Sequence, residues 1–75
     1  MIMSGTRDAQ IEALQKIDIH GTLMYDVQYR HDGESQSRRA RLGAESLPAN
    51  LRPGNRVRVH YLMNVATAIE LHSAG

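Results

Sequence analysis

The sequence predicts a mainly β protein: a small antiparallel barrel of two hairpins, with four to five strands and a short N-terminal helix. Three observations lead to this prediction. Apolar and polar residues alternate with a period of two over residues 17–29 and again over residues 57–71. An Asp-Gly pair, typical of hairpin turns, follows the first alternating stretch. The chain, residues 1–75, is expected to form one domain, with residues 1–5 flexible.

Residues 6–16 have the features of a helix start. Thr6 is a good N-cap, and Asp8 stands in the first turn, where the helix dipole favours an anion. Ile11 and Leu14 give a short apolar stripe with helical spacing. Because a helix of about ten residues needs tertiary contacts for stability, a partly ordered N-terminal arm remains the alternative.

Residues 17–29 are expected to form one long strand with a bend at Gly21. A strand of this length must curl if it serves both halves of a small barrel. The apolar side chains that would face the core all stand at odd positions: Ile17, Ile19, Leu23, Tyr25, Val27 and Tyr29.

The first hairpin is predicted to turn at residues 32–33, which form the Asp-Gly pair. A two-residue turn there would place Tyr25 opposite Ala40 on the buried face. On the other face it would place Asp26 opposite Arg39, where the two side chains would form a cross-strand ion pair.

Residues 44–54 are expected to connect the two hairpins. Leu47 and Leu51 would close one end of the barrel, through a single helical turn, and residues 53–54 (Pro-Gly) fit the centre of a type II turn.

The second hairpin has apolar residues at odd positions in both of its strands: Val57, Val59 and Tyr61, then Val65, Ile69 and Leu71. Both sets can face the core only if the loop has an odd number of residues. We therefore predict a three-residue loop, 62–64, with Asn64 left-handed, which places Val59 opposite Thr67. A five-residue loop is the alternative.

The segment LRPGNRVRVHY…VATAIEL, within residues 51–71, resembles the closing strands of small bacterial OB-like β-barrel domains. In those domains an L-x-x-G-x-x-V-x-V strand is followed by an A-T-x-I-E strand. The resemblance implies an OB/SH3-like barrel and carries over no functional residue. Small barrels of this class often bind single strands of nucleic acid.

No constellation of catalytic residues is evident, and we predict that the protein is not an enzyme. The chain has no Cys, no G-x-S-x-G and no glycine-rich phosphate loop. Its four histidines lack the spacing of metal ligands and are predicted to be solvated, so neither metal nor cofactor is expected. No apolar run approaches the ~18 residues of a membrane span, and we expect a cytoplasmic protein.

The positive charge is concentrated in the middle of the chain. Residues 30–60 hold seven arginines against three carboxylates, a net charge of +4, in a chain whose total is +1. On the predicted registers five basic groups point outward with only Asp26 nearby, and such a stripe would attract the backbone of RNA or single-stranded DNA. The predicted nucleic-acid-binding residues are Arg39, Arg41, Arg56, Arg58 and His60.

The aromatic residues do not support base stacking. The chain has no Trp or Phe, and all three tyrosines fall on the inward parity. A protein-interaction module, or an accessory subunit that forms a homodimer, therefore remains the alternative. Its support is an open sheet edge and three apolar residues predicted to lie outside: Met24, Leu62 and Met63.

Overall fold

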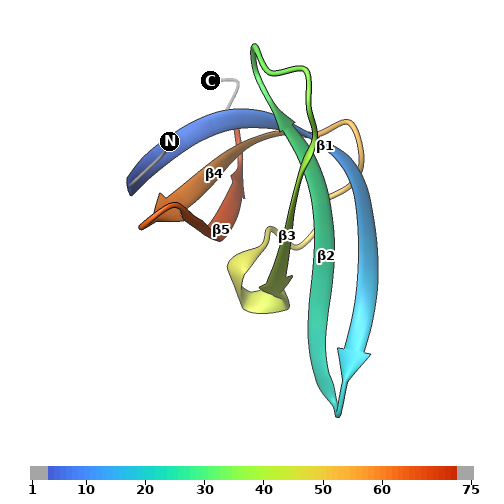
Figure 1. Ribbon diagram of the computed structural model, residues 1–75. Helices are drawn as coiled ribbons and strands as arrows, with labels where there is room; N and C mark the ends of the chain where they lie inside the picture. Colours follow the sequence, from blue (N-terminus) through green and yellow to red (C-terminus); the bar gives the residue numbers. More distant parts are fainter. Residues whose placement is uncertain (1–3, 73–75) are drawn as a thin grey trace.

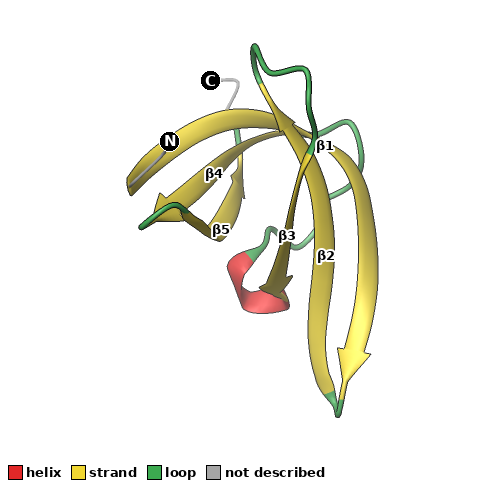
Figure 2. Ribbon diagram, in the orientation of Figure 1, coloured by secondary structure: helices red, strands yellow, loops and turns green. Residues whose placement is uncertain are grey.

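The computed structural model describes residues 4–72, which form one five-stranded antiparallel sheet (Figure 1). The mainly β prediction is confirmed, and the single helical turn is a small part of the fold (Figure 2). The strands run in the order β3-β2-β1-β4-β5. No helix in residues 4–72 has the length and hydrophobicity to cross a membrane. The elements are β1 (Ser4–Ile19), β2 (Thr22–His31), β3 (Arg38–Gly43), the 3-10 turn η1 (Ala44–Ser46), β4 (Arg56–Leu62) and β5 (Val65–Leu71).

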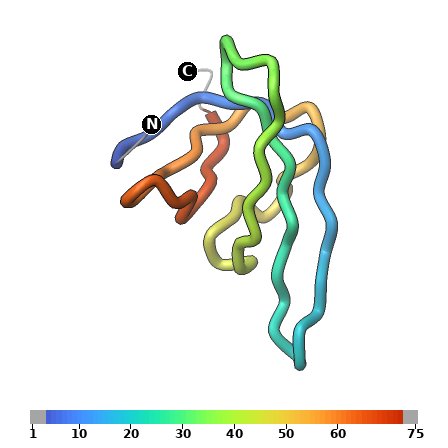
Figure 3. The backbone as a smooth tube through the Cα atoms, viewed as in Figure 1, coloured from blue at the N-terminus to red at the C-terminus, as the bar shows by residue number. Residues whose placement is uncertain are grey.

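Strand β1 is shared by both halves of the sheet. Its residues 4–10 pair with β4, and its residues 9–19 pair with β2 on the other side. The strand arches, so that the β4–β5 hairpin turns back toward β3 (Figure 3). Ser4 and Gly5, expected to be flexible, pair with β4, while the rest of that stretch lies outside the described residues.

The predicted N-terminal helix is wrong, because its residues belong to β1. Ala9 and Ile11 face the core with the period of a strand. A β-bulge between Ile11 and Ala13 then shifts the parity, so that Leu14 also packs against the core. The bulge therefore gives Ile11 and Leu14 the spacing of a helix face.

The predicted single strand over residues 17–29 is also wrong, because the chain reverses at His20 and Gly21. Both residues have positive φ, 52° and 84°, as a two-residue type I′ turn requires. Asp18 Oδ1 accepts a hydrogen bond from the Gly21 amide at 2.8 Å. Because Ile19 pairs with Thr22, the odd positions before and after the turn lie on opposite faces of the ribbon.

The first predicted hairpin has the correct faces but the wrong register. Tyr25 lies opposite Leu42, and Asp26 lies opposite Arg41, two residues beyond the predicted partners. The Asp-Gly pair does form a turn, closed by a hydrogen bond from the Glu34 amide to the His31 carbonyl at 3.1 Å. The pairing of β2 with β3 begins only after the further loop residues 35–37.

In the second hairpin, Val59 and Ile69 face the core as predicted, but the loop and the register differ from the prediction. Its loop is Met63-Asn64, two residues with φ of 51° and 68°, so the left-handed Asn64 is confirmed and the three-residue loop is wrong. A bulge in β5 then restores the parity, and Val59 lies opposite Ile69. Val65, at the start of β5 before the bulge, is consequently 62% exposed.

The connection after β3 is close to its prediction. Leu47 and Leu51 pack against the core, next to the single turn η1. The Asn55 amide donates to the Arg52 carbonyl at 3.2 Å, and Gly54 has a φ of 93°, as the third position of a type II turn requires.

The core lies on the concave face of the bent sheet, with Tyr25 half-buried against it. Its buried apolar residues are Ala9, Ile11, Val27, Tyr29, Leu42, Val57, Val59, Tyr61 and Ile69. The predicted closed barrel is wrong. The edge strands β3 and β5 approach each other, but within residues 4–72 they do not pair. Pairing needs a strand spacing of about 4.8 Å, and a groove lies between these edges instead.

The turn of the second hairpin predicts a stabilising double substitution. A methionine with positive φ is unfavourable because its Cβ crowds the backbone, whereas Asn-Gly suits a type I′ turn. We expect Met63→Asn with Asn64→Gly to raise the free energy of unfolding by about 1 kcal/mol, measured by urea denaturation. The control, Leu62→Asn, removes a side chain that is 59% exposed from an ordinary strand position. An equal gain in the control would contradict the backbone explanation.

Candidate nucleic-acid interface

The sheet order divides the five predicted site residues into two groups. Arg39 and Arg41 lie on β3, at one edge of the sheet, and Arg56, Arg58 and His60 lie on β4. Strands β2 and β1 stand between them, so three strand spacings, about 14 Å, separate the groups. All five alternate with core-facing residues and point away from the core, but they do not form one continuous stripe.

The β4 group is paired with carboxylates. Arg56 forms a bidentate pair with Asp32, with nitrogen–oxygen distances of 2.7 and 2.5 Å. These hydrogen bonds lower the pKa of Asp32. Arg58 lies 3.8 Å from both Asp8 and Glu70. The expectation that Asp26 alone would neutralise the stripe is therefore wrong, because β1, β5 and the β2–β3 loop bring three more carboxylates to it.

The remaining predicted residues differ in their pairing. His60 Nε2 lies 3.0 Å from Glu70 Oε1. Arg41, rather than Arg39, pairs with Asp26, at 2.7 Å from Nε and 3.1 Å from Nη2. The hydrogen bonds from Arg41 chiefly lower the pKa of Asp26, and the charge of Arg39 adds to this effect. Within residues 4–72, Arg39 makes no side-chain hydrogen bond or ion pair of its own.

A groove of about 500 Å³ runs between β3 and the start of β5. One wall is formed by the first residues of β3, and the other by the β4–β5 turn and the residues after it. The lining residues are Tyr29, Arg38, Arg39, Ala40, Arg41, Tyr61, Asn64, Val65 and Ala66. The groove therefore holds three arginines and no carboxylate.

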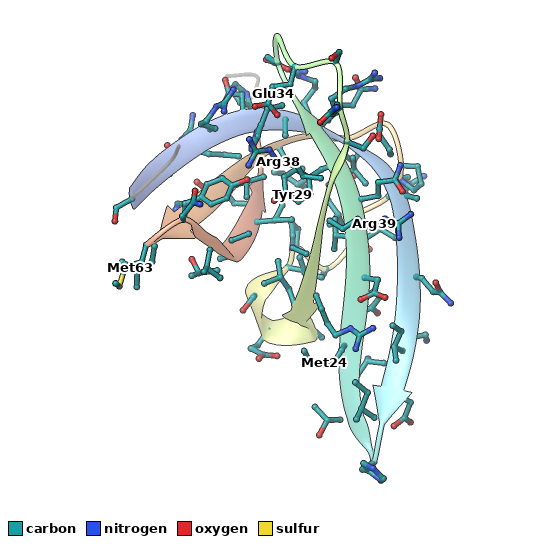
Figure 4. All side chains as sticks on the ribbon, in the orientation of Figure 1. Met24, Tyr29, Glu34, Arg38, Arg39 and Met63 are labelled. Atoms are coloured by element: carbon teal, nitrogen blue, oxygen red, sulfur yellow. The ribbon has the colours of Figure 1, made fainter. Side chains whose placement is uncertain are left out.

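Arg38 is the residue of this groove that the sequence analysis missed. It shares the inward parity of β3, and Figure 4 shows it on the side of Tyr29 and Glu34, opposite Arg39. Its Nε and Nη2 each donate to Glu34 at 3.0 Å, and Arg7 Nη1 donates to the same carboxylate at 3.2 Å. Chiefly through Arg38, the pKa of Glu34 falls to about 2. The sequence did contain a signal for this residue, because the alternation places Arg38 on the core-facing side of the predicted strand, where an arginine is unusual.

Under this groove lies a buried chain of hydrogen bonds whose direction is determined. His31 Nδ1 lies 3.1 Å from the Asp8 carbonyl, which can only accept, so Nδ1 carries the proton. In the neutral imidazole, which the lowered pKa of His31 favours, Nε2 then accepts from the Tyr61 hydroxyl at 2.6 Å, and the Tyr61 oxygen accepts from the Tyr29 hydroxyl at 2.9 Å. The expectation of a solvated histidine is wrong for His31, which is 1% exposed.

No protein-family model, curated protein or solved structure matches this chain. Among residues 4–72, no group of three or more His, Cys, Asp or Glu side chains could hold a metal ion. The candidate interface therefore rests on the geometry and charge of the groove.

The buried histidine predicts a loss of stability in mild acid. Burial is the largest cause that lowers the pKa of His31, Arg7 and Arg38 also lower it, and the Asp8 carbonyl and Glu34 oppose this. The unfolded chain, with a histidine pKa of about 6.5, then binds more protons than the folded one. The free energy of unfolding should therefore fall as pH drops through about 6.5 and level off below the folded-state pKa.

The test compares wild type with His31→Gln by urea denaturation between about pH 7 and about pH 5. The variant should lose part of the pH dependence, because glutamine does not titrate. Glu34, whose pKa falls from 4.5 to about 2 in the folded protein, begins to contribute only near the acid end of this window, and because both proteins contain Glu34 its effect cancels in the comparison. Equal slopes for the two proteins would exclude His31 as the source.

Proposed function

We propose that this chain is a non-enzymatic binding module that holds the backbone of single-stranded RNA or DNA in the groove between β3 and β5. The observation that carries the proposal is the groove lining, with three arginines from β3 and no carboxylate. Guanidinium groups suit phosphate because their planar fork of donors matches its oxygens. The volume of the groove, about 500 Å³, is within the usual range for ligand sites.

The ion pairs of the groove arginines support this role. Arg38 and Arg41 each use Nε and Nη2 to bind a carboxylate beside the groove. This holds each guanidinium in place and leaves Nη1 to donate to a ligand. Arg39 lies on the outer side of the same strand with its whole guanidinium available to a phosphate.

The topology supports the same proposal. A bent first strand shared by two halves, with the open side between β3 and β5, resembles the partly open five-stranded barrel of OB-like domains. In that class the face of the second and third strands, with the loop between the fourth and fifth, binds oligonucleotides. Here β3 and the β4–β5 turn form the two walls of the groove.

The proposed binding is tolerant of sequence and depends on phosphate contacts. Tyr29 and Tyr61 are 2% and 6% exposed, so their rings cannot stack on bases. Arg56, Arg58 and His60 are left out of the proposed site because they lie on β4 and do not line the groove. A cytoplasmic location, where RNA would be accessible, remains a prediction from the sequence.

The test is titration of labelled oligo-U and oligo-dT at several salt concentrations. We expect binding at low salt that weakens as salt rises. Arg39→Gln with Arg41→Gln removes two phosphate contacts, which should reduce the slope of log K against log salt by about 1.4. The matched control, Arg56→Gln with Arg58→Gln, removes the same charge from β4 and should leave the slope unchanged.

Three outcomes would overturn the proposal. Absence of oligonucleotide binding at low salt would rule out the proposed function. Equal losses of oligonucleotide affinity in the two double variants would show that net charge alone attracts the oligonucleotide, and would rule out the groove as its site. Binding of polyglutamate in the groove without binding of either oligonucleotide would assign the arginines to an acidic protein partner.

A further inference from the structure

We propose that this chain forms a two-fold dimer in which residues 15–19 of β1 pair antiparallel with the same residues of a second copy. The inference goes beyond the proposed function, because it concerns a different edge of the sheet. Strand β4 pairs with β1 only as far as Gln10. Gly54 and Asn55 then bind the backbone of Ile11. From residue 12 to residue 19, this edge of β1 has no backbone partner among residues 4–72.

The free edge belongs to a projecting two-stranded ribbon. Strand β3 pairs with β2 only from Met24 onward, so the end of the β1–β2 hairpin extends beyond the rest of the sheet (Figure 1). Ile19 and Leu23 in this ribbon are 38% and 39% exposed. Two-stranded ribbons are marginally stable in water, and an unpaired strand edge is a template for strand pairing. This edge contains no proline that would block pairing.

The turn determines which backbone groups face the free edge. Ile19 pairs with Thr22 across a two-residue turn, and such a turn is closed by a hydrogen bond from the Thr22 amide to the Ile19 carbonyl. In an antiparallel strand the two backbone groups of one residue point the same way, and this direction alternates. Ile17 and Ile19 therefore point their backbone groups to β2, whereas Lys16 and Asp18 point theirs to the free edge.

Lys16 and Asp18 make the free edge of one copy complementary to the same edge of a second copy. With Ile17 opposite Ile17 of the second copy, Lys16 lies opposite Asp18 of the second copy, and the two-fold axis repeats the pair. Each pair is of the hydrogen-bonded kind, so both backbone amides and both carbonyls are used. Opposite charges also face each other across the strands. This register keeps equivalent faces of the two sheets on the same side, as a two-fold axis requires.

The side chains of this pair are suited to the contact. Lys16 is exposed and makes no ion pair within the described part of the chain. Asp18 uses Oδ1 to accept from the Gly21 amide at 2.8 Å, which orients the carboxylate and leaves Oδ2 for a lysine. A second copy of this chain is therefore the occupant that the charges of the edge favour.

The experiment is sedimentation of the full chain from micromolar to millimolar concentration, with amide exchange measured at both ends of that range. A dimer should form as the concentration rises. The amides of Lys16 and Asp18 should become protected only in the dimer, while those of Ile17 and Ile19 are protected at both concentrations. A monomer throughout, or dimer protection elsewhere in the chain, would overturn the proposal.

Charge reversal tests the register. Lys16→Asp places like charges opposite each other twice and should raise the dimer dissociation constant about tenfold or more. The double variant Lys16→Asp with Asp18→Lys restores opposite charges and should recover most of the affinity. Arg52→Asp, in the loop before β4, is the matched control and should have no effect. A dimer unaffected by Lys16→Asp would overturn the register, and binding only to an unrelated protein would assign the edge to another occupant.

Discussion

Strand β1 has to satisfy neighbours on both sides, and it changes partner at Ile11. The Ile11 amide donates to the Asn55 carbonyl at 3.0 Å, and its carbonyl accepts from the Gly54 amide at 2.8 Å. The loop before β4 therefore takes over the hydrogen bonds of β1 where the β4 pairing stops, and the bulge that follows lets the strand change direction. Together with the pairing of β1 residues 4–10 to β4, this junction joins the two hairpins around one core. The concave face and the groove between β3 and β5 both depend on it.

The sequence predicted which faces are buried better than which residues pair. Alternation identified Val57, Val59 and Val27 as core residues, and all three are buried. A register error of two residues, as in the β2–β3 pair, leaves every side chain on its predicted face. Register depends on how many residues a loop uses before pairing begins, and the Asp-Gly turn did not reveal the additional residues that follow it.

Two β-bulges explain the predicted helix and the predicted three-residue loop. A bulge adds one residue to a strand and shifts the alternation after it, so Ile11 and Leu14 acquired the spacing of a helix. The second bulge allowed a two-residue loop at residues 63–64, where parity alone required an odd number. Because bulges are fixed by neighbouring strands, they are difficult to identify before the strand order is known.

The ion pairs, like the registers, could not be predicted from the alternation of residues alone. Parity correctly placed the arginines of β3 and β4 on the outer side, but it could not show their partners. Asp32 is distant from Arg56 in sequence, and only the strand order brings the two together. Glu70 lies opposite Arg58 in the β4–β5 hairpin, in a register that depends on the bulge in β5. The sequence therefore identified the cationic residues, whereas the fold shows that the arginines of β3 line the groove and those of β4 do not.

The buried chain from Tyr29 through Tyr61 to His31 also has an optical consequence. The protein contains three tyrosines and no tryptophan, so its intrinsic fluorescence comes from tyrosine alone. Two of these emitters lie beneath the groove, and their hydroxyls are bonded in series to an imidazole. A molecule that enters the groove changes the surroundings of both rings, and the emission of the unlabelled protein can then report its arrival.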